Sequence, residues 1–125
     1  MMKRILVPAF LALLGPLPAQ AADPALFHLA VKDAPVENGK VLDIEFKEVE
    51  RTPDASTVRI IRRSGGSVSS SMFVVRGLCG LARARGQQYV TGERIDKEHM
   101  RVTFPDTPPE GGKGFTMAQC ELLHY

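Results

Sequence analysis

The sequence predicts an α+β fold, in which an antiparallel sheet of about five or six strands carries one main helix, at about residues 70–85, on one face. Residues 41–51 alternate apolar and charged side chains, and a period of two is typical of a half-buried strand. Residues 70–85 instead repeat apolar side chains at helical spacing. Turn-forming residues separate these stretches and the other short extended ones.

The N-terminal residues predict export. Two basic residues precede an apolar run that is too short and too interrupted by proline to span a membrane as a helix. The Ala-Gln-Ala sequence at residues 19–21 has the form of a signal-peptidase site. We therefore expect residues 1–22 to be a signal peptide and residues 23–125 to be one small domain without a transmembrane segment. The predicted location is periplasmic or secreted.

The first predicted strand covers residues 26–32, and Gly39 lies in the turn after it. Residues 41–51 and 57–63 are expected to pair as an antiparallel hairpin. Five of their apolar side chains are predicted to face the core: Leu42, Ile44, Phe46, Val58 and Ile60. The alternation blurs at Glu48, where we expect a bulge.

On the outer face of this hairpin, Asp43 and Glu45 are expected to lie beside Arg59 and Arg63, because charges on paired strands attract across the sheet. The main helix is expected to begin at a serine cap within residues 69–71 and to end at Gly86. Its predicted apolar face consists of Met72, Val75, Leu78, Cys79 and Ala82.

After the helix, extended structure is expected to resume at residues 89–90. A further strand is predicted at residues 99–104, where Met100, Val102 and Phe104 share one face. The loop Asp106–Gly114 is rich in proline and glycine. A last strand is predicted at residues 115–125, with three side chains on its apolar face: Ala118, Cys120 and Leu122.

The chain has two cysteines, Cys79 and Cys120. In an exported protein an isolated pair favours a disulfide, and the redox spacing Cys-x-x-Cys is absent. We expect the bond to tie the middle of the helix to the last strand. Such a bond typically stabilises a small protein by ~2–4 kcal/mol.

Small residues form a narrow strip on the predicted helix, at Gly77, Gly80 and Ala84. Glycine inside a helix costs roughly 1 kcal/mol relative to alanine, so the strip needs a physical reason. Another backbone can approach it closely, and that backbone belongs either to this domain or to a second chain. Arg76 and Arg83 are seven positions apart and share one helix face. Together with the strip they form the candidate interaction surface.

Loss of the signal peptide removes two basic residues and no acid, which leaves 14 basic and 14 acidic residues and no net charge. This balance gives no support to nucleic acid as a partner. Residues 55–90 nevertheless hold six arginines and no acid. Four of them form a candidate anion patch: Arg59, Arg62, Arg63 and Arg85. Either the acidic first strands neutralise this block, or it faces an anionic envelope component such as a lipid phosphate.

We recognise no catalytic, metal-binding or cofactor motif. The three histidines lack the spacing of a zinc site: His28, His99 and His124. The serine-rich residues 64–71 match no nucleophile motif. Three glutamates on the second strand are expected to form a solvated edge rather than the acid pair of a glycosidase: Glu45, Glu48 and Glu50.

These features predict an exported, non-catalytic interaction protein, such as an inhibitor or accessory subunit of an envelope assembly. We expect it to act through the Arg76 and Arg83 side of the helix and the loop Asp106–Gly114, on a protein or an anionic envelope component. The oligomeric state is not defined by the sequence. The alternative is a small periplasmic hydrolase with a site built from scattered histidines and carboxylates. A carrier of a small apolar ligand ranks last, because its cavity would cost core packing.

Overall fold

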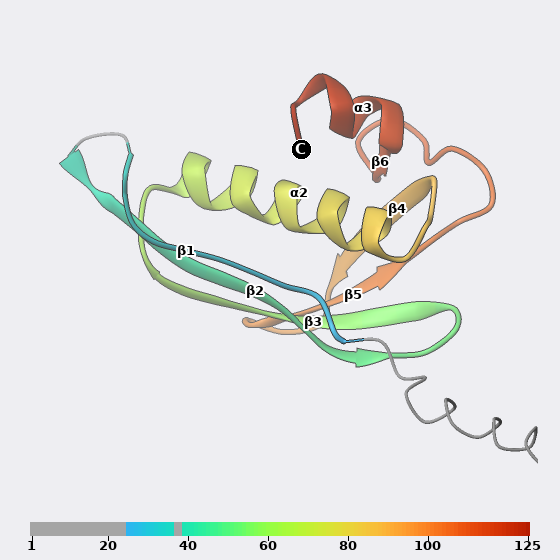
Figure 1. The fold of residues 1–125 in the computed structure, drawn as a ribbon, viewed down its shortest axis with the longest axis horizontal. Helices are drawn as coiled ribbons and strands as arrows, with labels where there is room; N and C mark the ends of the chain where they lie inside the picture. Colours follow the sequence, from blue (N-terminus) through green and yellow to red (C-terminus); the bar gives the residue numbers. More distant parts are fainter. Residues whose placement is uncertain (1–24, 37–38) are drawn as a thin grey trace, which may run out of the picture.

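The computed structural model describes residues 25–36 and 39–125, so the predicted signal peptide lies outside the described part (Figure 1). In chain order the elements are β1 (His28–Pro35), β2 (Val41–Arg51), β3 (Ala55–Ser64), α2 (Ser67–Ala84), β4 (Tyr89–Arg94), β5 (His99–Thr103), β6 (Phe115–Thr116) and α3 (Met117–Leu122). The predicted α+β class is confirmed, because six strands form one antiparallel sheet in the order β1-β2-β3-β5-β4-β6.

The β2–β3 hairpin forms as the alternation predicts. Phe46 lies opposite Ile60 in the antiparallel register, and both side chains are buried. The predicted bulge is also present, since the register shifts between Glu48 and Glu50. This hairpin supplies the middle of the core, because apolar side chains at alternate positions fall on one face of the sheet.

Helix α2 connects β3 to β4 and lies across one face of the sheet, with α3 on its other side (Figure 1). β5 lies between β3 and β4 and is antiparallel to both, so β3 and β4 run parallel and need this helical crossover. Neither of the helices described here combines the length and the apolar character that crossing a membrane would need.

The start of α2 differs from the prediction. The helix begins at Ser67, and its N-cap residue is Gly66 without a side-chain hydrogen bond, so a serine cap at residues 69–71 is wrong. The predicted end is confirmed. Gly86 has a φ of 68°, and the Gly86 and Gln87 amides donate to the carbonyls of the last helical turn at 3.0 and 2.9 Å. This pattern closes a helix where glycine accepts the left-handed conformation.

The buried surface of α2 covers two sides rather than one face. Gly77 is buried against the Phe46 ring of β2, whereas Cys79, two residues later, is bonded to α3. Residues two apart on a helix point about 200° away from each other, at about 100° per residue. Because the sheet and α3 each cover one side, Met72 is left at the margin with 37% of its surface exposed. Its predicted place on the buried face is therefore wrong.

The predicted last strand is wrong for most of its length. Strand β6 contains only Phe115 and Thr116, and residues 117–122 form α3. Thr116 caps this helix: its hydroxyl accepts from the Gln119 amide at 3.1 Å, and the Gln119 side chain accepts from the Thr116 amide at 2.9 Å. Such a capping box satisfies two amides that a strand would have paired elsewhere. As a result Leu122, expected on an apolar strand face, is 80% exposed.

The predicted disulfide between Cys79 and Cys120 is present, with 5.8 Å between the Cα atoms. Both cysteines are fully buried. The bond joins the middle of α2 to α3, not to a terminal strand as expected. It therefore holds the C-terminal segment on the side of α2 that faces away from the sheet (Figure 1).

Candidate functional site

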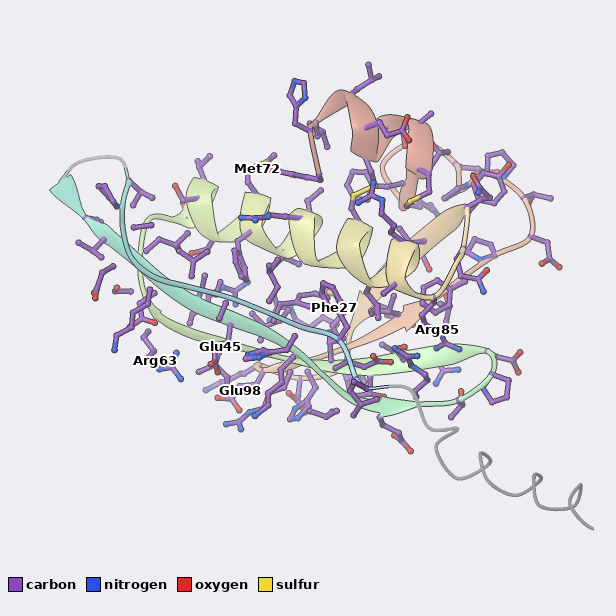
Figure 2. All side chains as sticks on the ribbon, viewed as in Figure 1. Phe27, Glu45, Arg63, Met72, Arg85 and Glu98 are labelled. Atoms are coloured by element: carbon purple, nitrogen blue, oxygen red, sulfur yellow. A yellow bond between two sulfur atoms is a disulfide. The ribbon has the colours of Figure 1, made fainter. Side chains whose placement is uncertain are left out.

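A groove with a volume of about 300 Å³ opens between the edge strand β1 and the first half of α2. Its main lining residues come from four parts of the chain: Val31, Leu42, Met72, Phe73, Arg76 and Tyr125. The described lining is largely apolar and contains no acid or histidine. Figure 2 shows Met72 on the side of α2 that carries the C-terminal segment. The fold thus leaves a surface of apolar side chains open beside one arginine.

Arg76 is exposed and has no ion-pair partner among the described residues, although it lines this groove. Arg83, seven positions later, is also exposed and lies in a smaller polar depression with Gln87 and Glu121. The two arginines of the predicted interaction surface therefore open onto different depressions. Of the two depressions, the one at Arg76 has the more apolar lining.

The small residues of the predicted surface are covered by the same chain. A Cβ atom at Gly77 would overlap the Phe46 ring, and one at Gly80 would lie 2.6 Å from the Phe27 ring. These two rings meet edge to face with 6.0 Å between their centroids. The glycines let α2 approach β2 and the residue before β1 closely, so side chains of this same chain fill the strip at both positions. Ala84, at the helix end, is exposed.

The four arginines of the predicted anion patch do not form one open surface. Arg59 pairs with Glu98 at 3.0 Å, and Arg63 contacts Asp43 at 3.2 Å and Glu45 at 3.4 Å. In Figure 2 Glu45, Arg63 and Glu98 lie on the side of the sheet away from α2. Asp43 and Glu45 were expected beside both arginines, but only Arg63 contacts them. Arg62 is exposed and has no described ion-pair partner.

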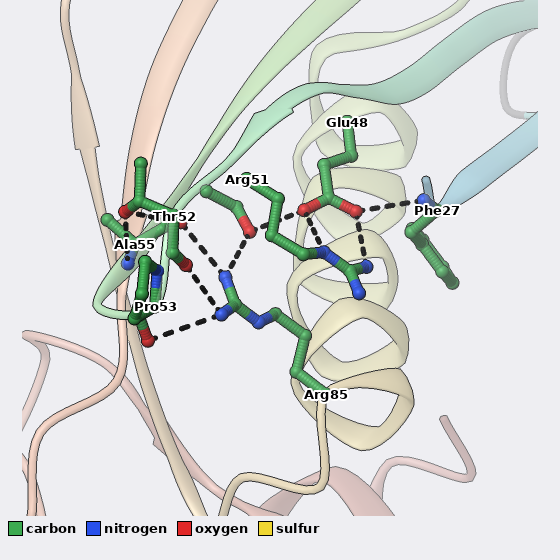
Figure 3. Close-up of polar contacts among 8 residues, drawn as sticks. Phe27, Glu48, Arg51, Thr52, Pro53, Ala55 and Arg85 are labelled. Carbon is green, nitrogen blue, oxygen red and sulfur yellow. Dashed lines mark hydrogen bonds and ion pairs between the residues drawn. The ribbon is translucent and has the colours of Figure 1, made fainter. Parts of the chain in front are cut away.

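Arg85 is partly buried and is held against the β2–β3 turn by backbone carbonyls (Figure 3). Its guanidinium donates to the Ala55 carbonyl at 2.9 Å, to the Thr52 carbonyl at 2.7 Å and to the Ser56 hydroxyl at 2.9 Å. It also lies 4.9 Å from the centre of the Phe104 ring. The arginine thereby fixes the end of α2 to the β2–β3 turn and is not available to bind an anion.

Glu48 is the one buried acid among the residues that the structure describes, and its predicted place on a solvated edge is wrong. Its carboxylate accepts from the Phe27 amide at 2.9 Å and from the Ser56 hydroxyl at 2.6 Å. Arg51 adds two bonds at 2.8 and 2.7 Å (Figure 3). The strand alternation could have located it. The even-numbered residues of β2 face the core, and Glu48 is the next even-numbered residue after Phe46. Burial by itself raises the pKa of Glu48, but the hydrogen bonds from Arg51, the Phe27 amide and Ser56 outweigh it and hold the pKa below its usual value.

A second groove, of about 450 Å³, lies beside the β2–β3 turn and is lined mainly by polar and charged side chains. Arg101, Asp54 and Asp106 are part of its wall, and Phe104, which supports Arg85, is another part. Asp106 brings the start of the predicted interaction loop into this wall. The groove combines charges of both signs and therefore favours no single ligand charge.

Two of the histidines each meet one carboxylate on the surface. His28 Nε2 lies 3.5 Å from a Glu45 oxygen, and His99 Nδ1 lies 2.9 Å from an Asp96 oxygen. The Glu98 amide, followed by the His99 side chain, lowers the pKa of Asp96. Within the described part of the chain, no three side chains of histidine, cysteine or acid type gather where a metal ion would bind.

Compared with known proteins, the chain matches no family model, no curated protein and no solved structure. A function must therefore be argued from the geometry of the chain itself. Sequence reasoning had selected Arg76 but not the groove around it, because Val31 and Tyr125 are far apart along the chain. No local pattern marks such a wall; only the fold brings its parts together.

Proposed function

We propose that this protein is an exported, non-catalytic binding protein, such as an inhibitor or accessory subunit of an envelope assembly, and that its partner is a protein. The observation that carries the proposal is the groove between β1 and α2. There Met72 leaves 37% of its surface exposed beside the guanidinium of Arg76, which has no ion-pair partner in the described part of the chain. Apolar surface next to a charged rim is typical of protein interfaces.

The chemistry of the groove supports a protein partner over an anionic polymer. Its described lining contains one arginine and is otherwise mainly apolar, so most of the binding energy must come from burying apolar surface. A phosphate-bearing partner would instead need several unpaired cations close together. Arg59, Arg63 and Arg85, three of the four arginines of the predicted anion patch, instead contact groups of the protein itself.

The groove also supports binding over hydrolysis. A hydrolase site built from histidines and carboxylates needs those side chains in one depression. His28 and His99 lie outside the groove, each paired with its own carboxylate. For export, the support is the N-terminal signal-like pattern together with the Cys79–Cys120 bond, which persists in oxidising compartments.

Site-specific photo-crosslinking tests this function. We expect a benzophenone amino acid in place of Met72 to form an adduct of defined mass with one protein in cells that make the chain. Val49, on β2, is the matched control because it is apolar, 42% exposed and outside the groove. The additional change Arg76→Glu should lower the yield of the Met72 adduct. Equal adducts at both positions, or none at Met72, would overturn the proposal.

A further inference from the structure

We infer that the partner binds as an extended strand added to the free edge of β1, with alternate apolar side chains entering the groove and a carboxylate meeting Arg76. This inference rests on the proposed function and deepens it, because it specifies the conformation and the chemistry of the bound segment. Strand addition draws affinity from main-chain hydrogen bonds and specificity from pockets for every second side chain.

The first step is the open edge. Among the strands of residues 25–36 and 39–125, β1 is the outermost and pairs with β2 on one side only. The Glu48 amide donates to the Phe27 carbonyl at 2.8 Å. This bond shows which residues of β1 direct their backbone groups toward β2. Because hydrogen-bonded pairs alternate in an antiparallel ladder, Leu29 continues the bonding to β2. The backbone groups of His28 and Ala30 therefore point to the open edge and are available to another strand.

The second step is the alignment of this edge with the groove. Leu29 and Val31 pack against the core below α2, and Val31 also lines the groove. In a strand added beside β1, the residues opposite Leu29 and Val31 place their side chains on the same face of the sheet. Those side chains meet the wall formed by Met72 and Arg76. One segment can thus use the backbone edge and the groove at the same time.

The third step is charge. Arg76 in the groove and Lys32 on β1 are both exposed, and neither has a described ion-pair partner. A bound segment with a net negative charge satisfies both cations, whereas a basic one adds repulsion. The partner segment that fits is therefore apolar at every second position and acidic overall.

A second copy of this chain fits the edge poorly. Two β1 strands paired antiparallel about Ala30 would place His28 of one copy opposite Lys32 of the other. Both copies would also bring Arg76 to the same seam. Asp33, the acid of β1, lies in the bulge where the register shifts and has a φ of 59°, so it falls outside such pairing. Bulges of this kind restrict which chains an edge can accept.

The test uses the disulfide-bonded, signal-free protein and a phage library of random 12-residue peptides as the probe. We expect the selected peptides to carry apolar residues at alternate positions and a net negative charge. Synthetic copies should lose at least about tenfold in affinity toward Met72→Asp or Arg76→Glu, both of which change exposed side chains. Such a factor corresponds to about 1.4 kcal/mol.

Ala30→Pro tests the strand itself, because proline removes the amide that faces the edge and is tolerated on edge strands. We expect it to weaken peptide binding at least about tenfold, while Ala30→Val, which keeps the amide, leaves binding unchanged. Binding should also slow hydrogen exchange of the Ala30 amide. If Ala30→Pro fails to fold, N-methylation along the peptide replaces it, and the loss should recur at every second position.

The outcomes separate the two proposals. Peptides that depend on Met72 and Arg76 but tolerate Ala30→Pro and N-methylation would overturn strand addition and leave the groove as a binding site. Peptides that bind equally to the Met72→Asp protein would overturn both proposals. A library that yields no specific peptide, with a displayed control ligand recovered in parallel, would also overturn strand addition.

Discussion

Glu48 shows how one buried side chain organises its surroundings. Its carboxylate is fully buried, yet it receives four hydrogen bonds, from the Phe27 amide, from Ser56 and twice from Arg51. A buried carboxylate is tolerated only when such partners replace the water it has lost. The Ser56 hydroxyl, which donates to Glu48, also accepts a hydrogen bond from Arg85. This network therefore connects the residue before β1, the β2–β3 turn and the end of α2.

Replacement of Glu48 by glutamine should show how much the negative charge of this side chain contributes to the free energy of unfolding. We expect Glu48→Gln to lower the free energy of unfolding at neutral pH by about 3 kcal/mol, the lower end for removing one partner of a buried ion pair, because Arg51 keeps some exposure. The folded pKa of Glu48 is lowered, so its contribution is complete above the unfolded value near 4.5 and is lost as the pH falls through the folded pKa.

Urea titrations of both proteins between neutral and acidic pH measure this difference. The gap between wild type and Glu48→Gln should narrow below about pH 4.5, as the wild-type carboxyl becomes protonated. Glu50→Gln is the control, because Glu50 is exposed and has no described ion-pair partner. A gap that stays constant down to the acid transition would show that the charge of Glu48 does not stabilise the fold.

Gly77 illustrates a glycine that is required by close packing and not by its backbone angles. Alanine would improve helix propensity by roughly 1 kcal/mol, but its Cβ would overlap the Phe46 ring. Overpacking of this kind typically costs about 1–3 kcal/mol. We expect Gly77→Ala to be destabilising overall, by thermal and urea unfolding. Gly111→Ala, where nothing lies within 4 Å, should be close to neutral. A Gly77→Ala protein as stable as wild type would show that Phe46 moves freely.

At the scale of elements, the sequence was informative where one pattern dominated. β2 could be predicted because its even positions are apolar through Phe46, and the end of α2 because Gly86 suits the left-handed conformation. The apolar face of α2 was predicted only in part, since a helix covered on two sides has no single buried stripe. The groove could not be predicted from the sequence, because its walls come from β1, β2, α2 and Tyr125, which are far apart along the chain.

The prediction of a strand at residues 115–125 failed because two sequence patterns in this segment indicate different structures. Apolar residues at alternate positions 118, 120 and 122 suggested a strand, whereas the Thr-x-x-Gln sequence at residues 116–119 is the signature of a capping box. The cap prevailed, and of the three alternate positions only Cys120 is buried. A local hydrogen-bonding motif therefore decided the element where the apolar pattern was short.

The cap itself can be tested. We expect Thr116→Ala to cost about 1 kcal/mol, the usual value for loss of an N-cap, and to speed hydrogen exchange within residues 117–122. Thr107→Ala, in the exposed part of the preceding loop, is the control and should leave both measurements unchanged. Unaltered exchange in α3 of the Thr116→Ala protein would mean that the disulfide alone maintains the helix.

At the scale of the whole molecule, the disulfide helps to hold the C-terminal residues 117–125 in place beside α2. α3 has six residues and one buried side chain, Cys120. A helix this short is not stable alone, so the bond to Cys79, together with the packing of Met117 against the core, holds it beside α2. Because Tyr125 follows α3 and lines the groove between β1 and α2, the same bond also maintains one wall of the proposed binding site.

Removal of both sulfur atoms should therefore loosen the C-terminal segment and also weaken peptide binding to the groove. We expect Cys79→Ala combined with Cys120→Ala to lower the free energy of unfolding by ~2–4 kcal/mol. Hydrogen exchange should rise in residues 117–125 but not in β2 and β3, whose core is packed independently by Phe46 and Ile60. Peptides selected for the groove should bind the double variant more weakly, since Tyr125 is no longer held at its wall. If the double variant kept its peptide affinity while α3 exchanged freely, the C-terminal wall would play no part in binding, and recognition would depend on β1 and α2 alone.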